Sequence, residues 1–157
     1  MRVTIAAVGR WAGGCGKGAP ARALFDAYAE RLALPLALKS CGEKRPLPRP
    51  ERKRREAELL GKLVPKGALV VALDARGKTF TSADFARLLQ SWRTRGIKDV
   101  CFLIGGADGL DDSTMTGAAL VLSLGPMTWP HLLVPALLAE QLFRAESILA
   151  GHPYHRE

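Results

Sequence analysis

The stretch VCFLIGGADGL, Val100–Leu110, decides how the rest of the chain can be arranged. Val100–Ile104 is an unbroken apolar run of strand length, and two glycines, Gly105 and Gly106, follow it at once. A short run without polar alternation is typical of a strand covered on both faces, as in a parallel sheet. Glycine directly after such a strand lets the backbone come close to a ligand. The stretch therefore predicts a buried parallel strand that ends in a tight, ligand-accessible turn.

Four other apolar runs of strand length surround this one: VTIAAV (3–8), LPLALK (34–39), ALVVAL (68–73) and ALVLSL (119–124). Helical patterns separate them, among them an apolar stripe at Phe85, Leu88, Leu89 and Trp92 behind the capping signal TSAD (81–84). A long apolar helix is expected over 131–150. This alternation predicts an α/β fold, a mainly parallel sheet with helices on both faces, in a single domain over residues 1–157.

Three strand exits share an unusual backbone composition. They are ALDARGK (72–78), LIGGADGL (103–110) and LSLGPMTWPH (122–131), the last stiffened by Pro126 and Pro130 around a flexible Gly125. Open α/β sheets bind ligands at the carboxyl ends of their strands. The three exits are therefore expected to form one pocket.

Composition narrows the class of protein. With 157 residues, 48% hydrophobic and 24% charged, the chain has the composition of a globular protein. No apolar run is long enough to span a bilayer, and the apolar stretch at the start is too short for a signal peptide. Three cysteines, Cys15, Cys41 and Cys101, share no metal-ligand spacing. We expect no metal site, no membrane partner and a cytoplasmic location.

The positive charge is concentrated in the first part of the chain. The net charge is +8, and residues 1–66 hold 15 Lys and Arg against 6 Asp and Glu. The densest run is EKRPLPRPERKRRE, 43–56. A solvated helix face would explain such a run, but a phosphate backbone rewards it through counterion release. Nucleic acid is the favoured partner.

A glycine-rich segment offers a different function. GGCGKGA (13–19) does not match a phosphate-binding Walker loop, because Gly18 stands where Ser or Thr is needed. The looser dinucleotide pattern fits Gly14, Gly16 and Ala19 ahead of a helix, although the preceding strand ends too early for a tight turn. A dinucleotide binder that uses Gly14 and Gly16 stays possible.

Several motifs, in order, resemble one known family. They are VTIAAVG, LDARGKTFTS, LIGGADGL, MTWPH, AEQLFRAESI and the terminal HPYHRE. Together they span nearly the whole chain and are similar to the RlmH family of ribosomal RNA large-subunit pseudouridine methyltransferases, which belongs to the SPOUT superfamily.

The resemblance implies a fold and an activity. It implies a C-terminal trefoil knot, a homodimer, and S-adenosylmethionine as methyl donor. It also implies methylation of N3 of a pseudouridine in the helix 69 stem-loop of large-subunit rRNA, on the assembled ribosome. Carried over by motif, the cofactor contacts are Leu73, Gly105, Leu124, Gly125, Pro126, Met127, Thr128 and Trp129.

The terminal segment then acquires a chemical interpretation. In the implied dimer, one subunit completes the active site of the other. Tyr154, His155 and Arg156 supply a hydrogen-bonding ring, a group that exchanges protons near neutrality, and a cation for an anionic oxygen. We predict that His155, or a group it orients, assists deprotonation while Tyr154 and Arg156 position the nucleotide. A purely structural role for the tail stays open.

Two residues near the start of the last predicted helix are harder to interpret. His131 has two interpretations, a site residue or a helix-start or interface residue, and the second is favoured. Pro135 stands where members of the family often carry an arginine, and it is tolerable only in the first turn of a helix.

A non-catalytic function is also compatible with the charge of the chain. A basic protein that merely docks on rRNA would share the positive segment 1–66. Such a protein would not need a ligand pocket formed by the three strand exits. The composition of these exits therefore favours the enzyme.

Overall fold

The computed structural model describes residues 1–10 and 19–155. Its elements, in chain order, are β1 (Arg2–Val8), α1 (Ala19–Ala29), β2 (Leu36–Cys41), α2 (Arg49–Gly61), β3 (Leu69–Thr79), α3 (Ser82–Thr94), β4 (Asp99–Ile104), α4 (Asp112–Thr116), β5 (Leu120–Ser123) and α5 (Val134–Leu149). Each of the five predicted apolar runs forms a strand. Within the described ranges, no helix combines the length and the apolar character needed to cross a bilayer.

The five strands form one sheet in the order β2-β1-β4-β3-β5. Every neighbouring pair is parallel, so the carboxyl ends of all strands lie at the same edge. The predicted α/β fold with a parallel sheet is confirmed. The trefoil knot implied by the resemblance concerns how the chain is threaded, which strand order does not test, and it stays a prediction.

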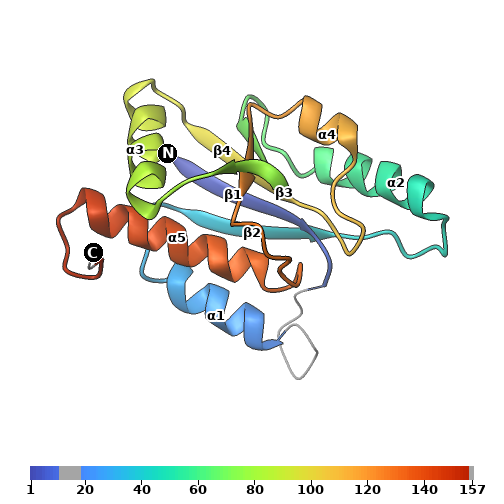
Figure 1. The fold of residues 1–157 in the computed structure, drawn as a ribbon, viewed down its shortest axis with the longest axis horizontal. Helices are drawn as coiled ribbons and strands as arrows, with labels where there is room; N and C mark the ends of the chain where they lie inside the picture. The colour runs from blue at the N-terminus through green and yellow to red at the C-terminus, as the bar shows by residue number, and fades with distance from the viewer. Residues whose placement is uncertain (11–18, 156–157) are drawn as a thin grey trace.

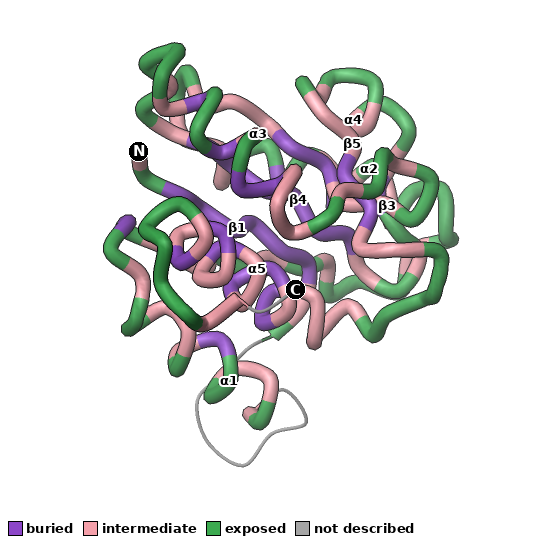
Figure 2. Tube along the Cα trace, turned by 60° about the vertical axis from the view of Figure 1, so that its left-hand side comes forward, coloured by how far each residue is buried: buried purple, intermediate pink, exposed green. Residues whose placement is uncertain are grey.

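Helices cover both faces of the sheet, as predicted (Figure 1). On one face α1, α3 and α5 bury a large apolar core that includes Phe102 of β4 and Leu142 of α5. On the other face α2 and the turn before α4 bury a smaller one around Leu103 and Leu60. Figure 2 shows the buried strands between these two helical layers. Alternate residues of one strand thus enter opposite cores, which explains the unbroken apolar runs.

Local signals in the sequence explain where the helices begin. The Thr81 hydroxyl accepts a hydrogen bond from the Asp84 amide at 3.0 Å, so TSAD caps α3 as predicted. Asp111 caps α4 in the same way by accepting from the Ser113 amide at 3.0 Å. Pro135 lies in the first turn of α5, where a missing N–H costs no helical hydrogen bond. The proline at position 135, where members of the family often carry an arginine, therefore leaves the last helix intact.

Candidate cofactor-binding and active site

The carboxyl ends of β4 and β5 and the middle of β3, at Leu73–Ala75, surround one cavity of about 410 Å³. Most of the predicted cofactor contacts line it: Leu73, Gly105, Leu124, Gly125, Met127, Thr128 and Trp129. Pro126 belongs to the same loop but is not among the lining residues. Geometry thus brings the three strand exits together, and cofactor binding by these residues stays a prediction.

The turn after β4 is held by backbone contacts that leave no space for a side chain at Gly105. A Cβ atom there would lie 2.5 Å from the carbonyl carbon of Gly109 and 2.7 Å from the Leu110 amide nitrogen. The turn is closed by a hydrogen bond from the Gly109 amide to the Gly106 carbonyl at 3.0 Å, and Gly109 has a φ of 78°. Gly105 and Gly109 are therefore needed for the turn that forms this wall of the cavity.

The exit of β3 differs from the sequence prediction, which ended the strand at Leu73. β3 continues to Thr79, and both Leu73 and Lys78 align with Leu122 of β5, so residues 74–77 bulge out of the sheet. A Cβ at Gly77 would lie 2.6 Å from the Val121 carbonyl oxygen, so glycine is required where the chain returns. The second half of β3 contains polar residues and a glycine, so it does not appear as an apolar run in the sequence.

The bulge brings Asp74 to the wall of the cavity. Its carboxylate accepts hydrogen bonds from Arg76, one of them from Nε at 2.8 Å. The Arg76 guanidinium lowers the pKa of Asp74 against the opposing effect of burial, and keeps the carboxylate ionised. The segment 72–78 was expected at the pocket, but Asp74 was not predicted as a site residue; the Asp-x-Arg spacing is the available signal in the sequence.

Ser123 shapes the exit of β5. Its hydroxyl accepts from the Gly125 amide at 3.1 Å and donates to the Gly125 carbonyl at 3.0 Å, while Gly125 adopts a φ of 114°. After this turn, Met127 and Trp129 are exposed by 71% and 40% although both are large and apolar. Ser123 was not predicted as a site residue; a serine two residues before a glycine is the signal in the sequence.

His131 lies beside the cavity as well as near the start of α5. It belongs to the turn that precedes Val134, and it lines the cavity together with Pro130 and Trp129. The interpretation of His131 as a helix-start residue is therefore incomplete, because the same turn forms part of the cavity wall.

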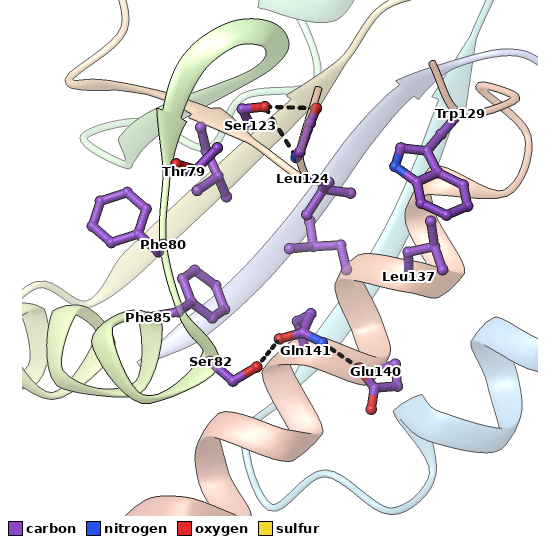
Figure 3. A pocket seen from close by; sticks show the side chains of 13 residues that line it. Thr79, Phe80, Ser82, Phe85, Ser123, Leu124, Trp129, Leu137, Glu140 and Gln141 are labelled. Atoms are coloured by element: carbon purple, nitrogen blue, oxygen red, sulfur yellow. Dashed lines mark hydrogen bonds between the residues drawn. The ribbon is translucent and has the colours of Figure 1, made fainter. Parts of the chain in front are cut away.

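A second cavity, of about 340 Å³, adjoins the first one (Figure 3). The two share Leu122, Leu124, Gly125 and Trp129 as walls. Its polar side is a chain of hydrogen bonds in which Ser82 donates to Gln141 at 2.9 Å and Gln141 donates to Glu140 at 2.7 Å. No sequence signal pointed to this cavity, because α3 and α5 meet only in the folded chain.

The tail packs on its own chain. After Gly151, with a φ of 66°, the Tyr154 ring stands edge-on to Phe143 at 4.7 Å between centroids. Its hydroxyl donates to Glu140 at 3.2 Å and lies 3.4 Å from the Tyr28 hydroxyl. Burial and then these polar neighbours raise the pKa of Tyr154 to about 12. Tyr154 therefore stays protonated at neutral pH and acts as a hydrogen-bond donor.

His155 follows Tyr154, and its Nδ1 atom is buried with no hydrogen-bond partner within the described part of the chain. Arg156 lies outside the described residues, as do Gly14 and Gly16 of the possible dinucleotide site. Neither Tyr154 nor His155 lines the cavity at the strand exits or the one beside it. Among the described residues of the tail, Tyr154 contacts the lining of the second cavity through its hydrogen bond to Glu140.

Glu140 holds this end of the network in place. It accepts from Arg144 Nε at 2.9 Å, a pairing of oppositely charged residues four apart along α5. The same carboxylate accepts from Tyr154 and Gln141, so its charge is shared among three donors. A completion of the cavity by the tail of a second chain remains a prediction.

Comparison with known proteins identifies the family. The profile described as "Predicted SPOUT methyltransferase" matches residues 1–155. The chain is 56% identical over 156 residues to "Ribosomal RNA large subunit methyltransferase H" of Paramagnetospirillum magneticum, and 51% identical over 156 residues to the protein of that name from Rhodospirillum centenum; each alignment covers 99% of both chains.

A solved structure agrees on the fold. A probable methylase family protein from Haemophilus influenzae superposes with a TM-score of 0.55 at 13% identity, over 99% of this chain and 70% of the other. Since full-length relatives and the family profile agree with the motifs, the resemblance is confirmed: the chain belongs to the SPOUT methyltransferase family, in the branch of ribosomal RNA large subunit methyltransferase H.

Proposed function

We propose that the protein, as a single SPOUT domain over residues 1–157, methylates N3 of a pseudouridine in the helix 69 stem-loop of large-subunit rRNA. The substrate is the assembled ribosome, and the reaction takes place in the cytoplasm. The observation that carries this proposal is the convergence of Leu73, Gly105 and the 124–129 loop on one cavity. The names of relatives that are 51–56% identical over the full length support the choice of rRNA.

Membership of the SPOUT methyltransferase family makes S-adenosylmethionine the methyl donor. The cavity fits it: about 410 Å³ lies in the usual range of small-molecule sites, and the walls are apolar side chains and glycine turns. Asp74 places an ionised carboxylate in the wall, which suits a cationic ligand. When bound, S-adenosylmethionine supplies a sulfonium methyl group, which passes to N3 as S-adenosylhomocysteine leaves and the N3 proton passes to a base.

The protein must prepare the acceptor nitrogen. N3–H of pseudouridine is a weak acid that is protonated at neutral pH, so its lone pair is not available for attack. A base must remove the proton, or a cation must stabilise the anion, while the ring is held in line with the methyl group. We assign the proton transfer to His155 or a group it orients.

The other tail residues position the nucleotide. Burial raises the pKa of Tyr154 to about 12, so we assign Tyr154 to hydrogen bonding or ring contact with the nucleotide and not to proton removal. Arg156 is assigned to an anionic oxygen of the substrate.

The site requires two chains in this proposal. Within one chain Tyr154 packs on Phe143 and Glu140, and neither Tyr154 nor His155 lines the cavity at the strand exits, so we infer that a partner subunit supplies the tail to that cavity. Met127 and Trp129 support this view, because large apolar side chains at a cavity mouth are left uncovered by the single chain. We therefore propose a homodimer in which each tail completes the other subunit's cavity.

Two other functions make different predictions. A non-catalytic rRNA-docking protein would bind ribosomes but not S-adenosylmethionine or S-adenosylhomocysteine. A dinucleotide binder that uses Gly14 and Gly16 would bind NAD instead. Titration calorimetry with S-adenosylmethionine, S-adenosylhomocysteine and NAD separates these functions. We expect heat of binding with the first two ligands and none with NAD. Binding of NAD alone would exclude the methyltransferase.

The substrate itself is tested in cells. We expect mass spectrometry of large-subunit rRNA from a strain lacking the gene to show the loss of one methyl group on a pseudouridine in helix 69. The wild-type gene on a plasmid should restore the mass. An unchanged nucleoside profile in the deletion strain would contradict the proposed substrate.

A further inference from the structure

The basic run of the sequence forms α2, and most of its acidic residues are already engaged or buried. Five of its thirteen residues, Arg49–Gly61, are Lys or Arg. On the inner side Leu60 and Glu56 are buried. Glu58 pairs with Arg55 at 2.6 Å, and Arg55 also lies 3.4 Å from Glu43. The helix therefore directs its uncompensated positive charge outward from its first two turns.

Three cations of these turns lie together on the surface. Arg49, Lys53 and Arg54 line one open hollow with Pro50 and Asp111. Over residues 1–10 and 19–155, neither Lys53 nor Arg54 forms an ion pair with a carboxylate. The Asp111 carboxylate is occupied by hydrogen bonds from the Ser113 amide and hydroxyl. Asp111 offsets part of the charge of Lys53 and Arg54, and Arg49 also faces Asp108, but three cations against one lining carboxylate leave the hollow with a net positive charge.

This hollow adjoins the cavity at the strand exits through a single turn. Gly105, Gly106, Ala107 and Gly109 line the cavity, and Asp108 in the same turn accepts from Arg52 Nε at 2.9 Å. Arg49 lies 3.2 Å from the same carboxylate. A Cβ at Gly106 would come within 3.2 Å of Glu56 Oε2, so α2 packs directly on the turn. A polyanion on the outer face of α2 is thereby held beside the cavity.

We propose that Arg49, Lys53 and Arg54, the α2 patch, hold the phosphate backbone of the RNA substrate next to the methyl-transfer cavity. This proposal rests on the proposed function, since it takes RNA as the substrate. Lys and Arg bind phosphates and release counterions, whatever the base sequence. The patch is the RNA-positioning surface, and the cavity is where the base reacts.

The test compares two double variants with the same change in charge. Lys53→Gln with Arg54→Gln removes two cations of the patch. Arg95→Gln with Lys98→Gln removes two cations between α3 and β4. These residues lie at the amino end of β4, whereas the cavity lies at its carboxyl end. Neither pair is buried, so both variants should unfold at the wild-type temperature. The probe is ribosomes purified from a strain lacking the gene, with binding followed by co-sedimentation at several salt concentrations.

The expected results separate the patch from nonspecific charge. The Lys53/Arg54 variant should bind ribosomes on the order of tenfold more weakly, and the slope of log K against log salt should fall by about 1 for each cation lost. Its affinity for S-adenosylmethionine should equal that of the wild type. The Arg95/Lys98 variant should match the wild type in all three measurements.

Three outcomes would overturn the inference. One is an unchanged affinity and salt slope in the Lys53/Arg54 variant, and another is an equal loss in the Arg95/Lys98 variant. A third is poly-glutamate binding as tightly as ribosomes with the same dependence on Lys53 and Arg54, which would assign the patch to acidic proteins. If the wild type failed to methylate ribosomes at all, the proposed function itself would fall, which is a distinct result.

Discussion

Single residues decide how closely the turns around the cavity approach one another. Gly105 is buried against the backbone of its own turn, and Gly77 is held against β5. At both positions a Cβ would meet main-chain atoms, which cannot move aside as a flexible side chain can. The shape of the cavity therefore depends on glycine at these two positions, because any larger residue would push the turns apart.

Gly105→Ala tests this dependence. The added methyl group should destabilise the protein by about 1–3 kcal/mol and sharply weaken S-adenosylmethionine binding, because the turn must open. Gly61→Ala is the matched control, since a Cβ there meets nothing within 4 Å. Chemical denaturation and calorimetry provide the two measurements, and a Gly105→Ala protein with wild-type stability and affinity would refute the role of the turn.

His155→Ala addresses the chemical step. We expect turnover to fall roughly 10²- to 10⁴-fold, the usual loss when a general base is removed, with S-adenosylmethionine affinity unchanged. The measurement is methyl transfer to ribosomes at saturating substrate. A wild-type turnover rate in this variant would show that His155 does not take part in the proton transfer.

The ionisation of Tyr154 tests the packing of the tail. Its pKa is raised to about 12 from an ordinary value of 10.0, mainly by burial. The folded state therefore keeps the proton between these values while the unfolded chain loses it, so this contribution to stability is present below pH 10 and declines as the pH rises towards 12. Ultraviolet titration of wild type against Tyr154→Phe should place the extra ionisation near pH 12; ionisation near pH 10 would mean that the tail is not packed on α5.

At the scale of elements, much could be predicted because the signals are local. Buried parallel strands appear as unbroken apolar runs, and TSAD contains the hydrogen-bonding groups that cap α3. The extension of β3 beyond Leu73 could not be predicted, since its polar residues pair with β5 only through a contact distant in sequence. The cavity between α3 and α5 was missed for the same reason.

The cap of α3 gives a prediction at this scale. Thr81→Ala removes the acceptor for the Asp84 amide and should lower the free energy of unfolding by about 1 kcal/mol. Thr94→Ala, at the end of the same helix, removes only a bond to the Gln90 carbonyl and should stay within about 0.5 kcal/mol of wild type. Equal losses in the two variants would show that the cap does not contribute.

At the scale of the whole molecule, the fold separates three tasks. The strand exits form the cavity, α2 carries an excess of positive charge beside it, and Tyr154 of the tail lies on α5 and near Tyr28 of α1. Each part could be identified from its residues and from the family resemblance. The place of the tail relative to the cavity could not, because in the proposed dimer that relation depends on how two chains pack.

The most direct test of the proposed dimer mixes two inactive variants. Thr128→Arg places a bulky cation in the cavity lining and should abolish S-adenosylmethionine binding, while His155→Ala inactivates the tail. Each variant alone should be inactive. After co-expression, half of the dimers are mixed, and in each of these one intact cavity meets one intact tail from the partner.

The measurement is methyl transfer to ribosomes by the mixed population. If each tail serves the other subunit, activity should return to about a quarter of the wild-type value. If the mixture is no more active than the separate variants, the tail does not complete the partner's cavity and the proposed site is wrong.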